Sequence, residues 1–274
     1  MPYNKLLGIE LPEEINGSFF LPGINDILIY FIPGWSELPK SLQPAAYYLQ
    51  SLGYSVVVPS YPSFHITTRW TDWWYACWTQ LQGITQYGIK KTYLAGFSLG
   101  GLFALQAATL KDRLEQECGL QVMGVTSISP PLRLKWKPLL PSEAIRMSTF
   151  DRQIAQQINR IYPTIPFPQS EMCFEKYRGS KKHRPVISII ELIRAIHFTN
   201  QMLKRNTLQT PVSILLAEDD EIVDNTKTSR IAQKRLSKAV DIKKVPGRHN
   251  CLLDQSCKIA CEFIHKFISK TQEN

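Results

Sequence analysis

KTYLAGFSLGG, residues 91–101, combines an apolar strand-like run, the pattern G-x-S-x-G and the start of a helix. A serine hydroxyl becomes an effective nucleophile when a sharp, strained turn lifts it clear of the end of a strand. Glycines two positions before and after it allow neighbouring backbones to hold that turn. The first N–H groups of the following helix point at the same place. The stretch therefore predicts a strand, a turn presenting Ser98 as a nucleophile, and a helix; the alternative is a glycine-rich turn without chemistry.

Apolar runs and amphipathic stretches alternate on both sides of this turn. Before it and just after it, strands are predicted at 26–32, 54–58, 91–95 and 122–128, and helices at 41–52, 70–87 and 99–110. The alternation resumes with strands at 212–217 and 240–245 and helices near 226–238 and 252–269. This order predicts an α/β fold, a mostly parallel sheet flanked by crossover helices.

The alternation breaks between residues 132 and 207, where helical stretches surround a proline-rich middle and no strand pattern is evident. We therefore predict a core formed by residues 1–131 and 208–274, with residues 132–207 inserted as a helical cap. The insertion holds 14 Lys/Arg and 5 Asp/Glu, whereas the rest of the chain holds 18 of each, so the net charge of +9 lies entirely in the insertion. This segment is either a solvated basic face or a surface that attracts an anionic membrane or substrate. It contains no nucleic-acid-binding motif.

A serine nucleophile needs a base and an orienting acid, which in this chain order follow at later strand ends. The strand at 212–217 is followed by Glu-Asp-Asp-Glu-Ile-Val, residues 218–223. We favour Asp220 as the acid over Asp219, because the apolar residues after it would tuck back under the sheet. His249 follows the strand at 240–245 and is predicted to be the base.

An oxyanion hole would require two backbone N–H groups near Ser98. One is predicted to be that of Leu99, directly after the nucleophile. The other is predicted to be that of Trp35, in the loop Pro33-Gly34-Trp35-Ser36 after the first long strand. The alternative for that loop is a plain strand-ending turn.

Two further patterns favour packing over chemistry. Four tryptophans fall on one stripe of the helix predicted at 70–87, and core packing is favoured over an acyl-pocket wall: Trp70, Trp73, Trp74 and Trp78. Cys257 and Cys261 lie four apart on a predicted helix, where packing is favoured over a metal pair.

The composition excludes several other classes of protein. An apolar fraction of 44% and a charged fraction of 20% are typical of a globular protein. No apolar run reaches the roughly 18 residues needed to cross a bilayer. The N-terminus lacks the apolar core of a signal peptide, so a cytoplasmic location is expected. None of the six cysteines has zinc-finger spacing, and neither a metal nor an organic cofactor is expected.

Four motifs resemble those of thermostable bacterial carboxylesterases and monoacylglycerol lipases of the α/β-hydrolase superfamily: GFSLGG at 96–101, Asp-Trp-Trp at 72–74, Asp-Glu-Ile-Val at 220–223 and Gly-x-His at 247–249. The resemblance covers most of the chain and implies the α/β-hydrolase fold with a helical cap. It also implies that Ser98, Asp220 and His249 form the catalytic triad, with Trp35 and Leu99 in the oxyanion hole. One departure is that Pro33-Gly34 replaces the usual His-Gly; a proline there would stiffen the loop in place of the buttressing histidine.

The predicted activity is hydrolysis of carboxyl esters, with short or medium acyl chains or monoacylglycerol as substrates, through an acyl-enzyme on Ser98. One alternative is a lysophospholipase or acyl-thioesterase at an anionic lipid surface, with the basic cap, including the run at 181–184, as docking face. The other is a non-catalytic binding protein with a hydrolase fold, against which the intact Ser, Asp, His order argues.

Overall fold

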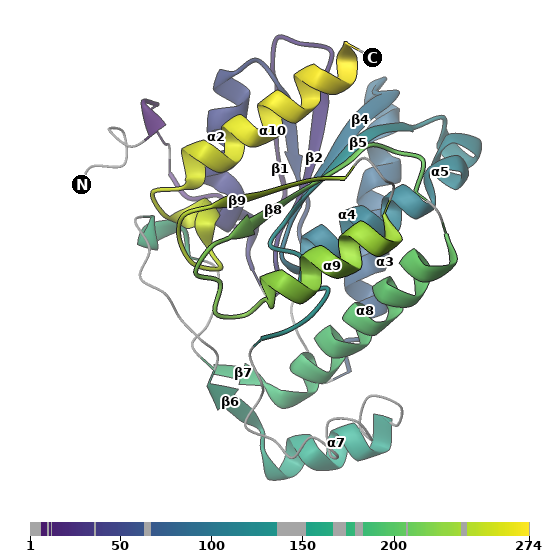
Figure 1. The fold of residues 1–274 in the computed structure, drawn as a ribbon, viewed down its shortest axis with the longest axis vertical. Coiled ribbons are helices and arrows are strands. Elements are labelled where there is room, and N and C mark those ends of the chain that lie inside the picture. The colour runs from purple at the N-terminus through teal and green to yellow at the C-terminus, as the bar shows by residue number, and fades with distance from the viewer. Residues whose placement is uncertain are drawn as a thin grey trace.

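The computed structural model describes residues 7–9, 11, 13–35, 37–62, 67–135, 152–166, 174–178, 183–206, 208–236 and 240–273. Its main sheet has seven strands in the order β1-β3-β2-β4-β5-β8-β9 (Figure 1). Neighbouring strands run parallel except β1, which pairs antiparallel with β3. The strands are β1 (Phe19–Leu21), β2 (Leu28–Ile32), β3 (Ser55–Val58), β4 (Lys91–Phe97), β5 (Gln121–Ile128), β8 (Val212–Ala217) and β9 (Asp241–Val245).

Helices cover both faces of this sheet (Figure 1). The α-helices of the described residues are α2 (Gln43–Ser51), α3 (Trp70–Gly83), α4 (Leu99–Thr109), α5 (Lys111–Cys118), α7 (Arg152–Ile161), α8 (Val186–Arg205), α9 (Asn225–Arg235) and α10 (Cys257–Gln272). Short 3-10 turns are η1 (Pro39–Leu42), η2 (Ile84–Tyr87), η3 (Glu175–Tyr177) and η4 (Cys251–Leu253). Among the described residues, no helix is both long and apolar enough to cross a membrane.

Strand β2 is a continuous apolar run because helices bury both faces of the sheet. Along β2, every residue is buried. Leu28, Tyr30 and Ile32 join the core cluster that includes residues of α3, α4 and α8. Ile29 and Phe31 join the opposite cluster, with residues of α2 and α10. Side chains alternate between the faces of a strand, so a strand covered on both sides becomes a continuous apolar run.

The predicted α/β order is confirmed, with three local differences. β1 was not predicted, because three residues at a sheet edge give too short a pattern. α5 was not predicted either, and it follows α4 after a single residue, Leu110. The last helix begins at Cys257 instead of near 252, because the 3-10 turn η4 precedes it.

The sequence predicts helices and no strand in residues 132–207. The described part of this segment contains helices, but it also holds the antiparallel pair β6 (Thr164–Pro166) and β7 (His183–Pro185), which forms a second, two-stranded sheet. α7 packs against α8. α8 in turn packs against α4, and a buried hydrogen bond of 2.7 Å joins Gln106 Nε2 to Thr199 Oγ1. The boundary between core and cap stays a prediction.

Candidate active site

Ser98 stands at the turn between β4 and α4, in a strained backbone conformation with φ 52° and ψ −116°. A positive φ is unfavourable for a residue with a Cβ, and such strain is often found at functional sites. The backbone N–H of Ser98 donates a 2.8 Å hydrogen bond to the carbonyl of Ile128 at the end of β5. The sharp turn predicted from G-x-S-x-G is therefore present and is anchored to the neighbouring strand.

The glycines around Ser98 make this turn sterically feasible. A Cβ on Gly96 would lie 2.1 Å from the carbonyl oxygen of Gly100. A Cβ on Gly100 would lie 2.1 Å from the carbonyl oxygen of Ile32, at the end of β2. Contacts under 3 Å with backbone atoms cannot be relieved by moving a side chain. The two glycines of the pattern are thus required by the close approach of three backbone segments.

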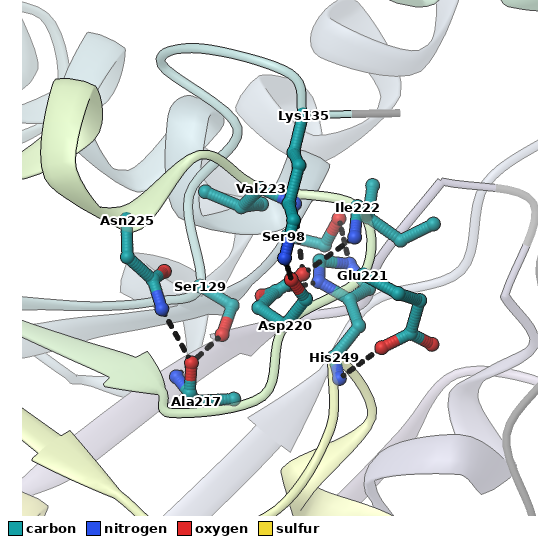
Figure 2. Close-up of polar contacts among 10 residues, drawn as sticks. All are labelled: Ser98, Ser129, Lys135, Ala217, Asp220, Glu221, Ile222, Val223, Asn225 and His249. Atoms are coloured by element: carbon teal, nitrogen blue, oxygen red, sulfur yellow. Dashed lines mark hydrogen bonds and ion pairs between the residues drawn. The ribbon is translucent and has the colours of Figure 1, made fainter. Parts of the chain in front are cut away.

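His249 lies between Ser98 and Asp220 (Figure 2). Its Nε2 is 3.0 Å from Ser98 Oγ, and its Nδ1 is 2.9 Å from Asp220 Oδ2. All three side chains are buried. The backbone N–H of His249 donates to Glu221 Oε2 at 3.1 Å, which ties its loop to the one that carries Asp220. The structure thus brings the three predicted residues into one hydrogen-bonded chain, although they come from loops after β4, β8 and β9.

Asp220, and not Asp219, contacts the histidine. Its Oδ1 accepts the backbone N–H groups of Ile222 and Val223, both at 2.8 Å, which leaves Oδ2 for His249. Ile222 and Val223 are buried, in line with the expected tucking of the loop. Asp219 is exposed, and its backbone N–H donates to the carbonyl of Gly247 at 3.0 Å.

His249 and Asp220 each favour the charged form of the other. Burial disfavours the charged imidazolium, but the charge and hydrogen bond of Asp220 and the charges of two further carboxylates together raise the pKa of His249 above its ordinary value. Glu221 and Glu37 add to the increase. Burial likewise works against the Asp220 carboxylate, but His249 and the two backbone N–H donors lower the pKa of Asp220. At neutral pH Asp220 is therefore a carboxylate, hydrogen-bonded to His249 Nδ1.

Supporting residues around the Asp220 loop were not anticipated from the sequence. Ser129 Oγ accepts the N–H of Ala217 at 3.4 Å, and Asn225 Nδ2 donates to the carbonyl of Ala217 at 2.6 Å (Figure 2). Lys135 Nζ donates to the Asp220 carbonyl at 3.3 Å. Ser129 has a positive φ of 44°, so it is a second strained residue beside the site. The only sequence feature that could have pointed to Ser129 is weak: it is a serine that precedes Pro130 at the end of a strand.

The two predicted oxyanion-hole residues come from two different segments: Leu99 directly follows Ser98, and Trp35 lies in the loop after β2. Leu99 is the first residue of α4, where backbone N–H groups have no acceptor within the helix. Trp35 follows β2 and is 5% exposed. The Arg184 guanidinium, from β7, lies 5.2 Å from the centroid of its indole ring.

Arg184 was predicted to belong to an exposed basic run, and that prediction is wrong. Its side chain is buried, with 3% exposure for the residue, and burial lowers the pKa of its guanidinium, while the nearby Glu37 works in the opposite direction. Arg184 therefore belongs to the contact between β7 and the loop of Trp35. Lys181 and Lys182 lie outside the described residues.

The tryptophan stripe and the cysteine pair pack in the core. Trp73 and Trp78 are buried, and Trp70 and Trp74 pack against the same cluster. Cys257 and Cys261 are fully buried in the opposite cluster. Among the described residues, no group of three or more His, Cys, Asp or Glu side chains is placed to hold a metal ion.

Comparisons with known proteins agree with this architecture. One solved structure, from work on the metagenome-derived lipolytic enzymes LipS and LipT, is 17% identical, covering 93% of this chain and 98% of the other, with a TM-score of 0.74. A monoacylglycerol lipase from Paleococcus ferrophilus is 16% identical, with coverages of 92% and 98% and a TM-score of 0.67. A soluble variant of the monoglyceride lipase of Saccharomyces cerevisiae, in complex with a substrate analog, is 17% identical, with coverages of 94% and 94% and a TM-score of 0.64. At such identities these likenesses establish the α/β-hydrolase fold alone.

Sequence comparison with curated proteins gives no match. A family model described as serine aminopeptidase, S33, matches residues 75–256, which include the Ser98 turn and the loops of Asp220 and His249. The match spans more than half of the chain. With the fold and the family model in agreement, the protein belongs to the S33 serine aminopeptidase family of α/β hydrolases.

Proposed function

We propose that the protein is a carboxylic ester hydrolase that works through an acyl-enzyme on Ser98. The observation that carries this proposal is the chain of hydrogen bonds from Ser98 Oγ through His249 to Asp220, at 3.0 and 2.9 Å. His249 Nε2 is within reach of the serine proton, and its other nitrogen is held by a carboxylate. The lipolytic enzyme and monoacylglycerol lipases among the similar structures support an ester as substrate.

The reaction follows from these positions. Ser98 Oγ attacks the ester carbonyl carbon while His249 takes the serine proton. The carbonyl oxygen becomes an oxyanion, stabilised by the backbone N–H groups of Leu99 and Trp35. His249 then gives its proton to the departing alcohol, which leaves an ester between the acyl group and Ser98. Water, deprotonated by His249, then attacks the carbonyl carbon of that ester; the bond to Ser98 Oγ breaks, His249 returns the proton to Oγ, and the carboxylic acid leaves.

A labelling and hydrolysis experiment tests this function. A fluorophosphonate should modify Ser98, and p-nitrophenyl esters of graded acyl length should be hydrolysed with a measurable chain-length optimum. Aminoacyl p-nitroanilides, the substrates suggested by the family's description, form the second arm. Faster cleavage of the anilides than of the esters would overturn the ester assignment. If the protein took no label and hydrolysed none of these substrates, the binding-protein alternative would be favoured.

The pH dependence of kcat/KM is expected to have an acid limb above the ordinary histidine pKa of about 6.5. His249 must be neutral to accept the serine proton, and its pKa is raised, so activity is lost as the pH falls through that raised value. Glu221→Gln removes one of the carboxylates that raise this pKa, and should move the limb to lower pH. Glu218→Gln, an exposed change in the same loop, is the control. If the acid limb of the Glu221→Gln variant lay at the same pH as that of the unmodified protein, the proposed effect of Glu221 on the pKa of His249 would be contradicted.

We also propose that part of residues 132–207 forms a cap over the site and that the cap docks on an anionic lipid surface. The contact between Arg184 and the Trp35 ring supports a cap that reaches the catalytic loops. Docking is supported by the basic excess of the segment and by an apolar pair beside the exposed Arg160 at the end of α7, where Ile161 is 70% and Tyr162 48% exposed. Aromatic and aliphatic side chains beside cations are typical of interfacial binding.

Vesicle binding checks this second proposal. The protein should sediment with anionic vesicles more than with zwitterionic ones, and about 0.5 M salt should release it, because screening weakens surface attraction. Arg160→Ser with Ile161→Ser should weaken binding severalfold while leaving hydrolysis of a small soluble ester intact. Lys258→Ser with Ile259→Ser, a matched exposed pair on α10, should bind as the unmodified protein does. Equal binding to both vesicle types would contradict docking through charge.

A further inference from the structure

The loop that carries Trp35 is held one peptide at a time. Pro33 has its φ fixed by its ring. The peptide between Gly34 and Trp35 is fixed by a hydrogen bond of 3.1 Å from the Glu37 N–H to the Gly34 carbonyl. Because the C=O and N–H of a peptide lie in one plane, orienting the Gly34 carbonyl also orients the Trp35 N–H. The peptide between Pro33 and Gly34, whose carbonyl belongs to Pro33, lies between the fixed proline ring and the fixed Gly34–Trp35 peptide.

Tyr61 supplies the hydrogen bond that fixes this intervening peptide. Its hydroxyl donates to the Pro33 carbonyl at 2.6 Å, from a loop that follows β3. The carbonyl also faces the Ser98 turn, since a Cβ on Gly100 would lie 2.4 Å from the same oxygen. The bond therefore holds the Trp35 loop against the turn of the nucleophile.

The tyrosine is itself held in place by its surroundings. Its ring packs edge-on against Phe103 of α4, with ring centroids 6.2 Å apart. The Cys77 thiol of α3 lies near its hydroxyl, and burial raises the pKa of Tyr61 well above its ordinary value. The hydroxyl therefore stays protonated, and a donor, throughout the pH range in which the enzyme would work.

We propose that Tyr61 is a positioning residue for the oxyanion hole, and that its hydroxyl, through the Pro33 carbonyl, sets the position of the Trp35 N–H. This inference rests on the ester hydrolase function proposed above. When an N–H donor is displaced by about 1 Å from the developing oxyanion, the rate of the reaction can fall on the order of 100-fold, even when the substrate still binds.

Tyr61→Phe removes only the hydroxyl and tests the proposal. Active sites are first titrated with the fluorophosphonate, so that kcat refers to folded enzyme. With the best p-nitrophenyl ester, kcat should fall about 10- to 100-fold while KM changes by no more than about twofold, since the lost contact acts in the transition state. A trifluoromethyl ketone, which Ser98 Oγ attacks to give a stable oxyanion while His249 takes the proton, should bind more weakly by about the same factor.

Tyr30→Phe is the matched control. The Tyr30 hydroxyl lies in the same buried region, but it donates to the carbonyl of Cys77 in α3, at 2.8 Å, and not to a carbonyl of the Trp35 loop. Its loss should lower thermal stability, as the loss of a buried hydrogen bond does, and leave both kcat and ketone affinity unchanged.

The outcomes separate this inference from the function on which it rests. Wild-type kcat and ketone affinity in Tyr61→Phe would overturn the role of Tyr61 and leave the ester hydrolase standing. An equal loss in Tyr30→Phe would also overturn it, because the effect would then come from general loosening of the core. Unmodified protein that takes no label and cleaves no ester would instead overturn the proposed function itself.

Discussion

Ser98→Ala is expected to lower kcat for ester hydrolysis by roughly five to six powers of ten, as in other Ser/His/Asp hydrolases. The variant lacks the atom that would carry the acyl group, and His249 Nε2 loses the partner that lies 3.0 Å away. His249→Ala should cost a similar factor, since the serine then has no base. The double variant should be no slower than either single one, because the two groups act as a unit.

The measurement is burst and steady-state hydrolysis of the best p-nitrophenyl ester, with thermal unfolding as the test of folding. Ser98→Ala keeps a Cβ at the strained turn and loses only a hydroxyl, so its unfolding midpoint should stay close to that of the unmodified protein. It should also take no fluorophosphonate label. Turnover at the wild-type rate in Ser98→Ala would place the nucleophile elsewhere.

The features predicted from the sequence were those encoded in consecutive residues. The strand before Ser98, the glycines around it and the helix after it all lie within residues 91–110, so one short stretch predicts the whole turn. The loops of Asp220 and His249 could be predicted because each directly follows a strand in a chain order that the fold requires. Their convergence on one site follows from parallel strands, whose carboxyl ends share one edge of the sheet.

The features that could not be predicted depend on contacts between distant residues. Tyr61 and Pro33 are 28 positions apart, and neither lies in a motif that would pair them. Arg184 belongs to a basic run, which normally indicates a solvated surface; its burial depends on where β7 lies relative to Trp35. β6 and β7 are three residues long and contain Pro166 and Pro185, so neither has a strand pattern, and pairing between them creates the strand.

Asp220→Asn is expected to lower kcat by about four powers of ten while leaving the fold intact. Asp220 Oδ1 accepts two backbone N–H groups, from Ile222 and Val223. An asparagine would keep its carbonyl oxygen there and turn its NH2 group toward His249 Nδ1. That nitrogen would then have to accept, which moves the ring proton to Nε2, and a protonated Nε2 cannot take the proton of Ser98.

Asp219→Asn is the matched control, since it makes the same chemical change in the adjacent residue. The Asp219 side chain is exposed, and the contact that anchors this residue, from its backbone N–H to Gly247, survives the substitution. It should therefore change kcat by no more than about threefold, as expected of a surface change away from the reacting atoms. The acid limb of the pH profile supplies a second readout: with its carboxylate neighbour gone, His249 in Asp220→Asn should have a lower pKa, whereas Asp219→Asn should keep the limb in place. A large loss in Asp219→Asn with an active Asp220→Asn would make Asp219 the orienting acid, and the 2.9 Å contact between Asp220 and His249 would then have no catalytic role.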